Sequence, residues 1–129
     1  MQASFDNGTS RTWNVARQIT YTGTAGQYIM TIDGFGASAN YQNLVVWGTS
    51  RQGEEFFTQI TQSLVCRQAC GWDPISGIKI HQIPSGEKSA TIAFGYDSNN
   101  QPIAGENCPE RYRVDWQRNN RSGTSYFPL

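Results

Sequence analysis

Few residues in this chain could perform chemistry, and the single histidine decides most of the possibilities. His81 is the only histidine, so a serine–histidine–acid or cysteine–histidine centre would have to use it. It lies inside the predicted strand Ile78–Ile83, and no nucleophile motif such as Gly-x-Ser-x-Gly lies near it. We therefore expect an ordinary strand histidine and predict that the protein is not an enzyme.

Three cysteines offer either a metal site or a disulfide. Cys66 and Cys70 have the looser spacing of zinc ligands, but His81 and Cys108 would have to complete the set, and both are isolated in the sequence. We therefore predict no metal site and no cofactor. In an oxidising compartment Cys70 and Cys108, which each follow a predicted loop or strand end, could form a long-range disulfide; the alternative is three reduced, buried thiols.

The acidic residues form no recognisable catalytic pair or calcium loop. Glu54 and Glu55 are adjacent, so a strand would direct them to opposite sides. The segment Asp97–Gln101 offers alternating oxygen ligands, as a calcium loop does at its start. Cys108, however, occupies loop position twelve, where such a loop needs glutamate. We expect Asp97–Gln101 to be a turn.

Trp72 is the residue most suited to binding. It lies in the predicted loop Cys70–Gly77 beside Asp73, and Pro74 limits the motion of that loop. An exposed loop tryptophan can stack on a sugar ring or anchor a protein interface, and Asp73 could accept hydrogen bonds from hydroxyl groups. The alternative is that Trp72 folds back and caps one end of the fold.

The elements that must position these residues are short strands. The segment Gln42–Ile60 reads as a central hairpin: an apolar run at Leu44–Trp47, a polar turn at Gly53 and a second run from Glu54. Further alternating segments are predicted as strands, and they are Thr12–Thr22, Gln27–Phe35, Ser63–Gln68, Ile78–Ile83, Lys88–Tyr96, Arg111–Gln117 and Thr124–Leu129.

These segments predict one all-β domain spanning residues 1–129, in which residues 1–10 form a loose end. About eight or nine short strands joined by turns are typical of an antiparallel β-sandwich; a small up-and-down β-barrel is the alternative. Ala90, Ile92, Phe94 and Tyr96 are expected to share one face of their strand. Three tryptophans on strands are expected in the core, and they are Trp13, Trp47 and Trp116.

Net charge and hydropathy limit the kinds of partner that the protein is expected to bind. Lys+Arg and Asp+Glu both number 10, so the formal net charge is zero, which argues against nucleic-acid binding. No apolar stretch approaches the roughly 18 residues that a membrane helix needs. The first residues lack the apolar core of a signal peptide. We expect either a cytosolic protein or an exported one whose leader has been removed.

Three sequence segments, taken together, resemble those of a known group of domains. They are Asn43–Arg51, Cys70–Gly77 and Ala90–Asp97, followed by Cys108. The chain resembles β-rich domains of exported and envelope proteins, often lipoproteins, of Bacteroidetes-type bacteria. This resemblance implies an exported location and a disulfide or packed pair between Cys70 and Cys108, and it implies no activity.

We therefore expect a non-enzymatic binding or adhesion module of an exported bacterial protein, with carbohydrate or protein as the ligand. Two alternatives remain. One is a structural subunit of a virion or fibre that self-associates through sheet edges or flat faces, and the other is a small-ligand carrier with an aromatic cavity.

Overall fold

The computed structural model describes residues 2–4, 10–105 and 107–129. Eleven β-strands and two single turns of 3-10 helix make up this part of the chain, and it contains no α-helix. The strands are β1 (Gln2–Ser4), β2 (Ser10–Val15), β3 (Arg17–Thr22), β4 (Ile29–Gly34), β5 (Gly36–Ser38), β6 (Tyr41–Thr49), β7 (Glu55–Arg67), β8 (Pro74–Ile83), β9 (Lys88–Tyr96), β10 (Arg111–Arg118) and β11 (Arg121–Pro128). The 3-10 turns are η1 (Gln68–Cys70) and η2 (Pro84–Gly86).

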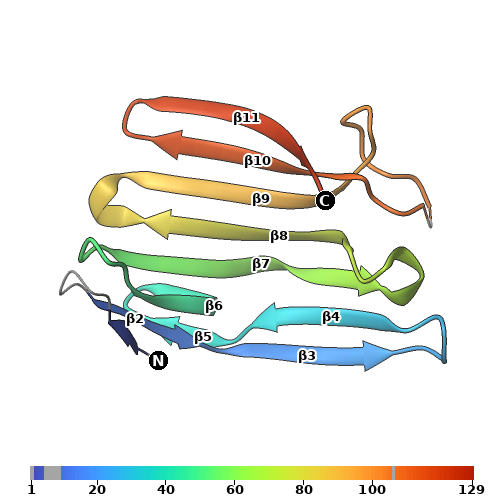
Figure 1. Ribbon diagram of the computed structural model, residues 1–129, viewed down its shortest axis with the longest axis horizontal. Coiled ribbons are helices and arrows are strands. Elements are labelled where there is room, and N and C mark those ends of the chain that lie inside the picture. Colours follow the sequence, from blue (N-terminus) through green and yellow to red (C-terminus); the bar gives the residue numbers. More distant parts are fainter. Residues whose placement is uncertain (1, 5–9, 106) are drawn as a thin grey trace.

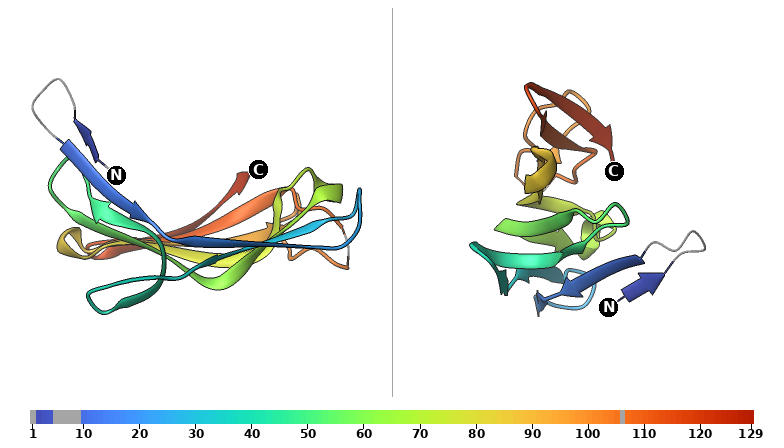
Figure 2. Two further views of the ribbon diagram at one scale, coloured as in Figure 1. Left: turned by 90° about the horizontal axis from the view of Figure 1, so that it is seen from below. Right: turned by 90° about the vertical axis from the view of Figure 1, so that its left-hand side faces the viewer.

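All the strands belong to one antiparallel sheet with the order β1-β2-β6-β7-β8-β9-β10-β11 (Figure 1). β3 and β4 form a hairpin that joins the sheet through β4 and β7, and β5 pairs with β6. The views in Figure 2 show that the sheet is strongly bent and remains open. β1, β3 and β11 therefore lie at edges of the sheet.

The long strand β7 organises the sheet because its two halves have different partners on one side. Its first half pairs with β6 in the predicted central hairpin, and its second half pairs with β4. The chain turns between these two regions at Gly34 and Gly36. A Cβ atom at Gly36 would lie only 2.4 Å from the Trp47 ring. Because glycine has no side chain, the backbone can pass close to this ring.

The core lies along β6 and β7. Leu44 of β6 has no exposed surface, and the main buried apolar side chains of the described residues are Leu44, Phe56, Phe57, Ile60, Leu64, Cys66 and Cys70. Tyr41 stacks on Phe57 with ring centroids 4.1 Å apart, which extends the core toward the start of β6.

The structure confirms the predicted all-β, antiparallel fold. It has eleven described strands where eight or nine were expected, and hydrogen bonds join them all into one sheet. The expected strand Thr12–Thr22 is divided at Ala16 into β2 and β3, which have different partners. Of the predicted loose end 1–10, residues 2–4 form β1 and residue 10 begins β2, while residues 1 and 5–9 lie outside the described part.

Two expectations about side chains are wrong, one about burial and one about direction. Trp116 was expected in the core, but 39% of it is exposed. Tyr96 was expected on the same face as Phe94. Gly95 has a φ of +103°, and the register shifts between Arg111 and Tyr112 on the neighbouring strand. This irregularity turns Tyr96 to the other face, where it makes an edge-on contact with Tyr126.

Candidate functional site

The disulfide links two segments that are distant in sequence. Cys70, at the end of η1, is joined to Cys108 in the long connection between β9 and β10. This pairing confirms the first of the two possibilities that the sequence left open. It also excludes the zinc set, because two of its four ligands are consumed. Cys66 is a buried free thiol.

Trp72 and Asp73 lie side by side at the surface immediately after η1, as expected for a loop, whereas residues 74–77 of the predicted loop form the start of β8. Gly71 and Trp72 both have positive φ, at +66° and +67°. The Trp72 amide donates a hydrogen bond to the Arg67 carbonyl oxygen at 2.9 Å, which fixes this turn. A positive φ is uncommon for a large residue and is retained where the surrounding structure imposes it.

The Trp72 ring has an aromatic partner that the sequence did not indicate. It meets Tyr21 of β3 edge-on, with ring centroids 6.2 Å apart. Trp72 is 37% exposed and Tyr21 is 60% exposed. We call these two residues the aromatic pair. Its members are 51 positions apart in the sequence, so only the β3–β4–β7 pairing brings them together.

Asp73 affects the interior as well as the surface. Burial raises the pKa of the Cys66 thiol, and the negative charge of Asp73 raises this pKa further. Cys66 is therefore held in its protonated form at neutral pH, and a protonated thiol is a poor nucleophile. The third cysteine thus functions here as a small apolar residue of the core.

His81 lies beside Phe56 in a cleft of about 280 Å³. Its Nδ1 is hydrogen-bonded to the Thr58 hydroxyl at 2.8 Å. Burial, and then the positive charge of Lys79, lower the pKa of the imidazole. The structure thus shows the hydrogen-bonded strand histidine that the sequence led us to expect.

Lowering the pKa of His81 makes stability pH-dependent. The unfolded chain binds the proton more tightly than the folded protein, so the free energy of unfolding is highest above the ordinary pKa of 6.5 and decreases as the pH falls below it. Urea unfolding measured between neutral and mildly acidic pH should show this decrease. In His81→Gln the dependence should flatten, because the chain has no other histidine. An equal slope in both proteins would contradict the assignment.

The predicted turn at Asp97 is formed by the side chain itself. Asp97 Oδ1 accepts hydrogen bonds from the backbone amides of Asn99 at 2.8 Å and Gln101 at 3.0 Å. This oxygen is thus used within the turn, as expected for an aspartate that begins one.

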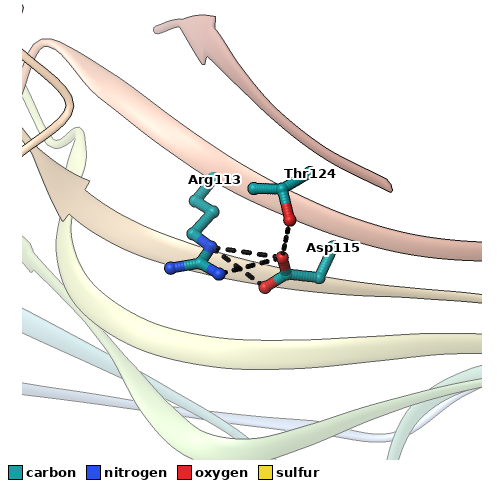
Figure 3. A network of polar contacts seen from close by, with 3 residues as sticks. All are labelled: Arg113, Asp115 and Thr124. Atoms are coloured by element: carbon teal, nitrogen blue, oxygen red, sulfur yellow. Dashed lines mark hydrogen bonds and ion pairs between the residues drawn. The ribbon is translucent and has the colours of Figure 1, made fainter. Parts of the chain in front are cut away.

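A polar network lies on β10 and β11 (Figure 3). Arg113 Nε is 3.0 Å from Asp115 Oδ2, and the Thr124 hydroxyl donates to Asp115 Oδ1 at 2.5 Å. The Thr124 hydrogen bond and then Arg113 lower the pKa of Asp115. The Arg113 and Asp115 side chains remain partly solvent-accessible, and the network orders the polar side of β10 and β11.

Side chains on the other face of the same strands are aromatic. Tyr112 of β10 is paired in register with Phe94 of β9 and Phe127 of β11, so the three rings share one side of the sheet. Their centroids are 5.9 Å and 5.6 Å apart. Alternation in Arg111–Gln117 indicated an apolar side to β10, but it could not indicate whether another layer covers it.

Comparison with known proteins gives no relative: the chain matches no protein family, no curated protein and no solved structure. None of the described helical segments has the length and apolar character to cross a membrane.

Proposed function

We propose that this protein is a structural subunit that assembles with further copies of itself through its open sheet. The observation that carries the proposal is the accessible surface. The chain exposes 8041 Å², whereas a compact monomer of its mass, 14.4 kDa, exposes about 6,800 Å². The excess of about 1,200 Å² per chain is larger than the roughly 800 Å² that each partner buries in a standard specific interface.

The distribution of apolar side chains supports the same function. Nine large apolar residues of the described chain remain exposed. Five lie on β2, β3, β10 and β11 (Val15, Ile19, Tyr21, Trp116 and Phe127) and four lie outside the strands (Tyr28, Phe35, Trp72 and Leu129). Contiguous exposed apolar surface in soluble proteins usually marks an interaction site. A formal net charge of zero removes the general repulsion that would otherwise keep copies apart.

Association coupled to folding makes thermal stability depend on protein concentration. If the subunits associate in pairs, a hundredfold increase in concentration should raise the melting temperature by roughly 5 °C. Differential scanning calorimetry at several concentrations measures this shift. A melting temperature that stays constant across the range would contradict coupled assembly.

A second function is favoured by the aromatic pair. We propose that Trp72 and Tyr21, with Asp73 beside them, bind a carbohydrate or protein ligand, because an exposed pair held by the disulfide and the Arg67 hydrogen bond loses little entropy on binding. A disulfide also fits an exported location, either secreted or in the cell envelope.

The variant Trp72→Ala tests the binding function. Because 37% of Trp72 is exposed, the free energy of unfolding should fall by roughly 2 kcal/mol, since the edge-on contact and part of the ring's burial are lost; this is less than the roughly 3–5 kcal/mol lost when a fully buried tryptophan is truncated. Binding to any ligand that the wild type captures on a glycan or protein array should be lost. Phe35→Ala, which removes an exposed ring outside the pair, is the control and should retain binding. A loss of several kcal/mol would instead identify Trp72 as a core residue.

A further inference from the structure

One face of the three C-terminal strands has the composition of a half-formed core. The register of β9, β10 and β11 places six apolar side chains on this side. We call them the aromatic face, and they are Ile92, Phe94, Tyr112, Val114, Trp116 and Phe127. Trp116 is 39% exposed and Phe127 is 42% exposed, although sheet residues of this type are normally buried.

Because side chains alternate along a strand, the opposite side of these strands carries a different set of residues, and on β10 they are polar. Gln117 follows Trp116, and the residues between those of the aromatic face include the polar network of Arg113, Asp115 and Thr124. A strand with one apolar and one polar side is typical of a sheet with a second layer on the apolar side. Among the described residues, β10 makes its main contacts with its sheet neighbours β9 and β11 (Figure 1). The end-on view in Figure 2 shows no other described strand stacked over β10 and β11, so the described strands do not supply a second layer there.

We propose that a second copy of this chain covers the aromatic face, so that two sheets pack face to face about a two-fold axis. This inference rests on the proposed function and names the surface through which it operates. A two-fold contact brings the same patch of both copies together, so the patch must be self-complementary. The six side chains carry no charge. The same side also carries four cations of the described chain: Lys79, whose Nζ lies 5.8 Å from the centre of the Phe94 ring, and Lys88, Arg118 and Arg121 near the β8–β9 and β10–β11 turns. The proposed contact therefore places the aromatic and branched side chains at its centre and leaves the turn end of each copy, with its like charges, at the solvent-exposed rim.

The exposed surface of the chain is large enough for a second copy to bind. A standard interface buries about 800 Å² on each partner. The excess surface of this chain, about 1,200 Å² over a compact monomer, is large enough for each copy to lose that area and still expose a normal amount. The aromatic face also lies at the β11 end of the sheet, where one of its outer strands is free to approach another molecule.

Sedimentation velocity of four proteins tests the inference: the wild type, Trp116→Lys, Phe127→Lys and Gln117→Lys. The first two variants place a charge on the aromatic face. Gln117→Lys adds the same charge one position away on the opposite face, where the residue is already exposed, and is the matched control. We expect the wild type and Gln117→Lys to dimerise equally, and the two face variants to bind at least tenfold more weakly.

The outcomes distinguish a failure of the proposed interface from a failure of the proposed assembly function. If the wild type associates and both face variants associate equally well, the aromatic face is not the interface, although the assembly function stands. If the wild type is monomeric at every concentration, both proposals fail. Circular dichroism establishes that the lysine variants are folded. Should either be unfolded, Phe127→Ser with the control Ser122→Ala replaces it, because serine removes the ring without burying a charge, and unchanged association of Phe127→Ser would overturn the inference.

Discussion

Reducing the Cys70–Cys108 disulfide should lower the free energy of unfolding by about 4 kcal/mol and the melting temperature by roughly 15 °C. The two cysteines are 38 residues apart, and a closed loop of this length restricts the unfolded chain considerably. It also ties η1, and with it Trp72, to the connection between β9 and β10. Calorimetry with and without reductant at one protein concentration measures the change.

Thiol titration and one variant provide the controls for this experiment. The unfolded, unreduced protein should have one reactive thiol, Cys66, and the reduced protein should have three. Cys66→Ala should remain sensitive to reductant, because it keeps the bridge while removing the thiol that could exchange with it. A melt that does not respond to reductant, together with three reactive thiols before and after, would show that the bridge is absent in solution.

Leu44→Ala should destabilise the fold by about 3–4 kcal/mol. Leu44 is fully buried where β6 pairs with both β5 and β7, so its removal leaves a cavity that strands on two sides cannot easily close. Urea unfolding at a fixed protein concentration gives the difference. Val15→Ala removes apolar carbons from an exposed residue of neighbouring β2 and should cost well under 1 kcal/mol. Equal effects of the two substitutions would mean that the core does not lie along β6 and β7.

Local pattern was sufficient to predict most of the strands and the central hairpin, but it placed the start of β8 (residues 74–77) in a loop. Alternation identified the segments that became β4, β9 and β10, and Gly53 identified the turn between β6 and β7. The same rules failed at the irregular positions. In Thr12–Thr22 the one irregularity is Arg17, which interrupts the apolar alternation immediately after Ala16, and it was not sufficient to predict two strands with different partners. Gly95 gave no signal that Tyr96 would change face, because a glycine within a strand is compatible with either a bulge or a regular pair.

The candidate site was only partly predictable. A loop containing Trp72, Asp73 and a cysteine was visible in the sequence, whereas its contact with Tyr21 depends on long-range strand pairing. Disulfide pairing among three cysteines is likewise decided by three-dimensional proximity.

The expected sandwich shows a further limit of sequence patterns. Alternation reports that one side of a strand is apolar, but it does not report whether the covering layer comes from the same chain. In our proposal that layer belongs to a second copy. The residues that indicated a core in the sequence, Trp116 among them, would then be buried only after association.

The molar mass of the wild-type protein in solution tests the central claim most directly. Multi-angle light scattering during size-exclusion chromatography at increasing load should give a mass that rises to at least twice 14.4 kDa. The rise should persist at high salt, because the proposed contact is apolar and is not screened. A constant mass of 14.4 kDa at the highest attainable concentration would show that the open sheet is stable as a monomer and would contradict the account.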